Sequence, residues 1–118
     1  MNYYESIFIL QPDLPSEQSE KITELMSGIV EKQGGRMHIV EDWGVKRLAY
    51  EVKKQKKGHY VLMQFAGEPE GIRELERNYR VNDGVIKYMT LRIDEDKLQT
   101  ITPKEESTAP AEDAETGE

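Results

Sequence analysis

The segment RMHIVEDWGVKRLAYEVKKQKKGHYVLMQF, residues 36–65, decides the fold because it holds two long β-type runs with no helix between them. Met37 and Ile39 alternate with polar residues, and the alternation resumes after residues 42–44. At ~3.3 Å per residue, the run 36–52 exceeds an ordinary strand, so we expect a bulge or bend near Gly44. KKQKKG (residues 53–58) predicts the turn and YVLMQF (residues 60–65) the returning strand of a long hairpin.

A helix is expected on each side of this hairpin. Residues 13–16 offer capping groups, and apolar residues then recur at helical spacing until Gly34 and Gly35 end the helix. The apolar face of this first helix comprises Ile22, Leu25, Met26, Ile29 and Val30. Pro69 and Glu70 open the second helix, whose inward residues are Ile72, Leu75 and Tyr79.

The first and last strands of the sequence complete the pattern. They are YYESIFIL (residues 3–10), which stops before Pro12, and VIKYMTLRI (residues 85–93), which follows the turn signal at residues 82–84. The order β-α-β-β-α-β predicts an α+β protein with the ferredoxin-like split β-α-β fold. We expect a four-stranded antiparallel sheet with two helices on one face and the first and third strands in the centre.

Both central strands are apolar on both faces, although two helices can cover only one. The helix-free face is therefore expected to hold a contiguous apolar patch, and patches of that kind usually mark a partner site. The alternative is that large side chains on this face simply cover one another.

The net charge of −7 over 118 residues is unevenly distributed. Residues 104–118 carry six acids against one lysine, whereas residues 43–59 carry six basic residues against Glu51. The folded domain is expected to span residues 1–98, followed by an acidic, disordered tail at residues 99–118. With no cysteine, no apolar run long enough for a membrane span and no signal-peptide pattern, we expect a soluble, unexported protein.

Catalytic motifs are scarce in this sequence. It has no glycine-rich phosphate loop, no nucleophile in a recognisable setting, and two histidines, His38 and His59, that look incidental. Paired acids at strand ends point to opposite faces, which does not suit a metal site. We therefore predict a protein that is not an enzyme and has no catalytic residue, metal or cofactor.

The basic hairpin has two interpretations. Lysines on an edge strand commonly block edge-to-edge pairing, but one or two are enough for that purpose. Four lysines crowd one turn here, and their mutual repulsion favours contact with a polyanion. Phosphate contacts of this type position a protein on nucleic acid without reading base sequence.

RNA-recognition-motif domains share this fold and stack bases on aromatic residues of the central strands. Residues 7–11 come close to their first-strand motif, but residues 57–64 lack the aromatic positions of their third-strand motif. Phe8 is also expected to point into the core, so base stacking on the sheet is the weaker hypothesis. A module that binds only protein is a further alternative.

The hairpin EDWGVKRLAYEVKKQKKGHYVLMQF (residues 41–65) resembles, nearly residue for residue, that of bacterial small-subunit ribosomal protein six. The resemblance continues through residues 4–5, 74–76, 82–83, 85–87, Met89 and Arg92, and covers residues 1 to about 95. Asn2 departs from the arginine frequent in the family, and Glu51 from its proline after Leu-Ala-Tyr.

The resemblance implies a non-enzymatic constituent of the small ribosomal subunit, in the cytoplasm. It would bind the central domain of small-subunit ribosomal RNA as a heterodimer with small-subunit ribosomal protein eighteen. The candidate RNA-binding residues are Lys46, Arg47, Lys53, Lys54, Lys56, Lys57, Arg80, Lys87 and Arg92. The candidate partner-protein interface comprises Tyr3, Ile7, Ile9, Trp43, Tyr60 and Leu62.

Overall fold

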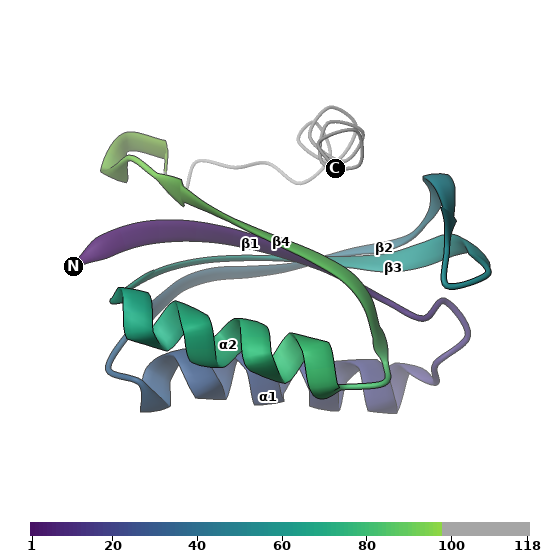
Figure 1. The fold of residues 1–118 in the computed structure, drawn as a ribbon, viewed down its shortest axis with the longest axis horizontal. Coiled ribbons are helices and arrows are strands. Elements are labelled where there is room, and N and C mark those ends of the chain that lie inside the picture. Colours follow the sequence, from purple (N-terminus) through teal and green to yellow (C-terminus); the bar gives the residue numbers. More distant parts are fainter. Residues whose placement is uncertain (98–118) are drawn as a thin grey trace.

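The computed structural model describes residues 1–97, which form four strands, two helices and one short 3₁₀ helix (Figure 1). In chain order the elements are β1 (Asn2–Leu10), α1 (Ser16–Lys32), β2 (Arg36–Val52), β3 (Gln55–Gly67), α2 (Pro69–Val81), β4 (Val85–Ile93) and η1 (Glu95–Lys97). The predicted order of elements and the α+β class are confirmed. The predicted tail, residues 99–118, lies outside the described residues, as does Leu98.

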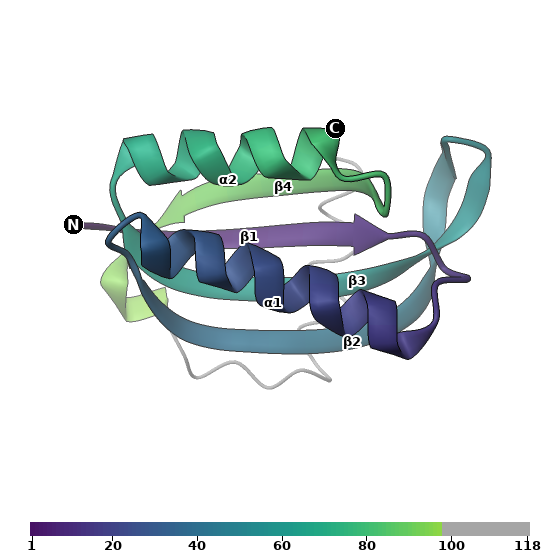
Figure 2. The same cartoon turned by 90° about the horizontal axis from the view of Figure 1, so that it is seen from below.

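The strands form one antiparallel sheet in the order β2-β3-β1-β4, so β1 and β3 are central, as predicted. β1 pairs with β3 from Asn2↔Gly67 to Leu10↔His59, and with β4 along its other side. Figures 1 and 2 show both helices on one side of the sheet. The opposite side, which carries no helix, is called the open face below.

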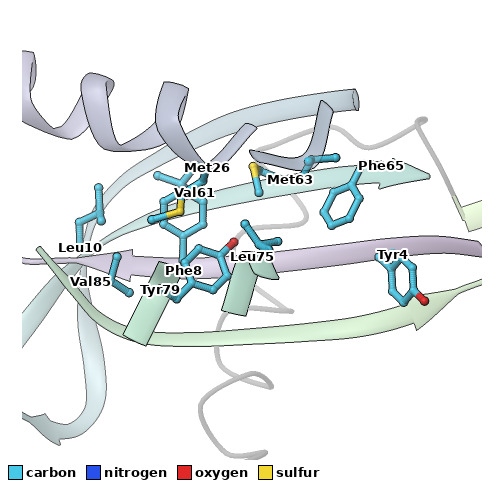
Figure 3. Close-up of a cluster of buried hydrophobic side chains, with 11 residues drawn as sticks. Tyr4, Phe8, Leu10, Met26, Val61, Met63, Phe65, Leu75, Tyr79 and Val85 are labelled. Carbon is cyan, nitrogen blue, oxygen red and sulfur yellow. The ribbon is translucent and has the colours of Figure 1, made fainter. Parts of the chain in front are cut away.

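The main core lies between the sheet and the two helices (Figure 3). Alternate residues of the central strands point into it, because successive side chains of a strand face opposite sides. From β1 and β3 these are Tyr4, Phe8, Leu10, Val61, Met63 and Phe65. The Phe8 ring lies 5.1 Å from the Tyr79 ring of α2, and Phe8 is fully buried, as expected. It therefore offers no surface on which a base could stack.

Helix α1 ends as predicted but does not begin as predicted. The amide of Gly35 bonds to the Val30 carbonyl and that of Gly34 to the Glu31 carbonyl, with Gly34 at φ +88°. This is a Schellman ending, which glycine favours because L side chains rarely adopt positive φ. At the other end no side chain caps the helix, so the predicted capping by residues 13–16 is wrong. Leu25, predicted to face the core, is 48% exposed.

The turn of the hairpin is shorter than predicted. Val52 pairs with Gln55, so only Lys53 and Lys54 form the turn, and residues 55–58 already belong to β3. The register of β2 against β3 shifts between Asp42 and Gly44, which confirms the bulge predicted there. Two further shifts were not expected, one between Met37 and Ile39 and a larger one between Arg47 and Val52.

A small polar group is buried inside the core beneath α2. The Ser6 hydroxyl lies 2.7 Å from the Tyr79 hydroxyl and 3.0 Å from that of Thr90 on β4. Burial raises the pKa of Tyr79 well above its usual value, and the hydrogen bond with Ser6 only partly opposes that rise. Tyr79 therefore stays neutral and fixes α2 over the two strands.

Candidate nucleic-acid interface

Residues 45–58, the outer half of the β2–β3 hairpin, are called the arm. Its base is shaped by Asp42, whose carboxylate accepts the Gly44 amide at 2.8 Å and shares a 2.7 Å hydrogen bond with the His59 ring. Gly44 has φ +81°, a conformation that glycine adopts without a steric penalty. Trp43 donates its indole N–H to Glu41 at 3.1 Å. The bulge thus redirects β2 at the point where the basic residues begin.

The tip of the arm is a two-residue turn made entirely of lysine. Lys53 has φ +50° and Lys54 φ +66°. Two-residue hairpin turns with both residues at positive φ strongly prefer Asn-Gly, because other side chains clash with the backbone in that region. The turn therefore holds two cations at a conformational cost of about 1–2 kcal/mol per residue.

At the end of the sheet the arm turns out of the plane of the other strands (Figure 1). Leu48 is buried in a second apolar cluster with Ile9 and Ile86. Further along β2, the Lys87 ammonium on β4 donates to the Tyr50 hydroxyl at 2.6 Å and lies 4.7 Å from the centre of its ring. Because β2 and β4 are the two edge strands, this contact spans the whole width of the sheet.

The structure divides the predicted RNA-binding residues into three groups. Lys53, Arg80 and Lys87 line one groove between the arm tip and the connection from α2 to β4. Arg92 stands apart, opposite Tyr4 near the other end of β4. The remaining residues lie along the arm: Lys46, Arg47, Lys54, Lys56 and Lys57. All nine are exposed except Lys46 and Lys87, which are partly buried.

The predicted partner-interface residues differ widely in exposure. Ile7, Ile9, Tyr60 and Leu62 are at most 5% exposed, since they form the second apolar cluster with Leu48 and Ile86. Trp43 packs against that cluster and is partly buried, as is Tyr3. Much of the patch expected on the open face is therefore buried, and Leu48 of the arm packs into it.

Two features of this region were missed in the sequence. The first is that the arm packs back against the sheet, which no local sequence pattern predicts. The second is the set of β4 residues that join the predicted interface residue Tyr3 in an apolar rim on the open face, at the end of the sheet away from the arm tip: Met89, Leu91 and Ile93. Period-two alternation in residues 85–93 could have revealed it, because Met89 pairs with Ile7 and Leu91 with Glu5 on the same face.

Metal-binding groups do not gather in the described part of the chain: no three His, Cys, Asp or Glu side chains in residues 1–97 could hold an ion together. Over the same residues, neither helix has the length and apolarity needed to cross a membrane.

Comparison with known proteins shows which family this chain resembles. The family model described as "Ribosomal protein S6" matches residues 3–92. The small ribosomal subunit protein bS6 of Moorella thermoacetica is 41% identical over 96 residues, which are 81% of this chain and 98% of that protein. The bS6 protein of Desulforapulum autotrophicum is 44% identical over the same share of this chain, but only 62% of its own length is matched. These names are those of ribosomal proteins and not of enzymes, as predicted.

A solved structure agrees with the sequence comparison. The crystal structure of 30S ribosomal protein S6 from Thermotoga maritima superposes with a TM-score of 0.75 at 35% identity, covering 78% of this chain and 87% of that one. The C-terminal domain of the MgtC protein from Mycobacterium tuberculosis shares the fold alone, with a TM-score of 0.54 at 9% identity.

Proposed function

The chain belongs to the ribosomal protein S6 family, and on that premise we propose that it is a structural constituent of the small ribosomal subunit that binds small-subunit ribosomal RNA. It binds the central domain of that RNA as a heterodimer with small-subunit ribosomal protein eighteen, in the cytoplasmic ribosome. Since some bS6 relatives extend well beyond the matched region, the proposed activity is that of the described domain.

The observation that carries the RNA-binding proposal is the charge of the arm. Arg47, Lys54, Lys56 and Lys57 are exposed on a chain whose net charge is −7, and within residues 1–97 none of the four forms an ion pair. Their repulsion is relieved when phosphates lie between them. Binding would release condensed counterions from the RNA, so affinity should depend steeply on salt.

The rim supports the protein partnership. Leu91 is 50% exposed on an edge strand, next to partly buried apolar neighbours on the same face. The acids Asp94, Glu95 and Asp96 follow directly in the chain and are exposed. An apolar strip beside acidic residues is complementary to a basic protein, and charge complementarity of this kind sets orientation and association rate.

Neutralising the arm tests the RNA-binding proposal. We expect the variant with alanine at Arg47, Lys54, Lys56 and Lys57 to weaken binding of the heterodimer to a central-domain transcript. The slope of log affinity against log salt should fall by about 0.7–0.9 for each phosphate that the arm no longer neutralises. Filter binding between 50 and 300 mM KCl measures both quantities. An unchanged slope contradicts phosphate contact by the arm, and the remote variant Lys21→Ala serves as the control.

A further inference from the structure

The groove lined by Lys53, Arg80 and Lys87 is built from parts of the chain far apart in sequence. Lys53 comes from the arm tip, Arg80 from the last turn of α2, and Lys87 from the start of β4. Figures 1 and 2 both place the arm tip and the α2–β4 connection at the same end of the molecule. Among the groove's described lining residues none is acidic. Three cations from three separate elements thus surround one concave surface.

The position of Lys53 is held by two independent features. The Lys87–Tyr50 contact fixes the arm against β4 three residues before Lys53. The tight turn then places Lys53 at positive φ, a conformation that favours asparagine or glycine. Backbone strain of this sort persists where the surrounding structure holds it, and it concentrates at binding sites. Lysine at this turn position is a poor choice for stability and a suitable one for contacting an anion.

Arg80 and Tyr88 form the opposite wall. Arg80 donates to the Tyr88 hydroxyl at 3.4 Å through one of its five N–H groups. The Tyr88 ring stacks on Tyr79 at 5.0 Å, so it is held firmly by the core while one side still faces the groove. A fixed guanidinium beside an aromatic ring, facing a lysine, is a combination used to hold the backbone of single-stranded nucleic acid.

We propose that this groove binds a backbone phosphate of an unpaired RNA segment between Lys53 and Arg80, with Lys87 holding the arm wall in place. The proposal rests on the RNA-binding function above and adds a defined site to it. An acidic peptide would find the same charges but not a use for the aromatic wall, so RNA is the occupant the groove favours. Free inorganic phosphate could contact the same cations, and the competition experiment below distinguishes it from RNA.

Two adjacent lysines provide a matched comparison. Lys53 lines the groove, whereas Lys54 has the same charge and nearly the same φ but does not line it. We expect Lys53→Gln and Arg80→Gln each to weaken binding of the heterodimer to the central-domain transcript roughly tenfold, and Lys54→Gln less than threefold. Each groove variant should lower the salt slope by about 0.7–0.9, as expected when one phosphate is no longer neutralised. The double variant should weaken binding by less than the product of the two single effects, because both side chains hold the same phosphate.

The remaining outcomes are decisive. If the wild type binds the transcript and Lys53→Gln and Lys54→Gln weaken that binding equally, the groove proposal is wrong. The proposal that the arm binds RNA is then unaffected. A wild-type heterodimer that does not bind the transcript overturns the proposed function and the groove with it. A third measurement compares three competitors for the bound transcript at equal ionic strength: a single-stranded RNA 12-mer, 10 mM inorganic phosphate and an octaglutamate peptide. If phosphate or the peptide displaces the transcript as well as the RNA 12-mer does, RNA is not the occupant. Thermal unfolding of each variant verifies that it is folded.

Discussion

Gly58 allows the arm to pack closely against the sheet because it has no side chain. A Cβ atom there would collide with the Cγ2 atom of Ile9 and lie 3.3 Å from the Leu48 Cδ2 atom. Both neighbours are themselves buried, so neither has free space to move into. The absence of a Cβ is therefore what lets Leu48 pack down on Ile9 and close the arm over the sheet.

Alanine at Gly58 tests this packing. We expect Gly58→Ala to lower the free energy of unfolding by about 1–3 kcal/mol, the usual cost of forcing extra volume into a packed core. Urea denaturation measures the change. Gly28→Ala is the matched control: Gly28 is exposed in the middle of α1 with no atom near its Cβ position, so the change should stabilise by up to about 1 kcal/mol. A wild-type midpoint for Gly58→Ala would contradict the close contact.

At the level of elements, the lysine turn is a source of instability that can be removed. Replacing Lys53 by Asn and Lys54 by Gly gives the sequence that such turns prefer. We expect the double variant to unfold at a higher urea concentration, with a gain of about 1 kcal/mol, because the positive-φ strain is relieved. Lys56→Gly is the control, since Lys56 lies in β3 without positive φ, and glycine should destabilise the strand there. No gain from the double variant would show that the turn is not strained.

Elements with local signals were predictable, and the arm was not. The bounds of β4, residues 85–93, match the prediction, because a turn signal and a β-branched run mark it within the segment itself. The arm's path depends instead on Leu48 meeting Ile9 and Tyr50 meeting Lys87, residues more than 35 positions apart. A register shift between Arg47 and Val52 brings these pairs together. Period-two alternation assigns residues to the two faces of a strand, but it does not give the position or size of such a shift.

The same limit applies to the candidate site. Charge clustering identified the basic residues of the arm, because six cations within 17 residues of sequence are visible without a structure. It could not show that Arg80 and Lys87 join Lys53 around one groove while Arg92 stays at the far end. Nor could apolar patterning show which open-face residues are covered.

For the whole molecule, most of the predicted interface residues on the open face are buried. We therefore expect the partner protein to dock on the rim. We expect Leu91→Arg to abolish association with the proposed partner, small-subunit ribosomal protein eighteen, because it places a cation in an apolar strip that would meet a basic protein. The fold should be kept, since Leu91 is half exposed. Analytical ultracentrifugation of the mixed proteins measures association. Val81→Arg, on exposed Val81 of α2, is the control and should bind normally.

Ile7→Glu, unlike Leu91→Arg, is expected to disrupt the fold itself. It would bury a charge in the second apolar cluster and unfold the domain, so loss of association in that variant says nothing about docking. Normal association of Leu91→Arg, with the fold intact, would contradict the rim as the docking surface.

The folded-back arm also bears on the chain's life before assembly. A ribosomal subunit is built protein by protein, and a newly made protein waits in a crowded cell until its place is available. A bare sheet face carrying Ile7, Ile9, Tyr60 and Leu62 would attract other exposed chains during that interval. Leu48 of the arm packs into this cluster, so part of the face is already covered in the free protein. We expect this packing to reduce aggregation of the unassembled protein, while the exposed basic residues of the arm stay available for the proposed contact with RNA.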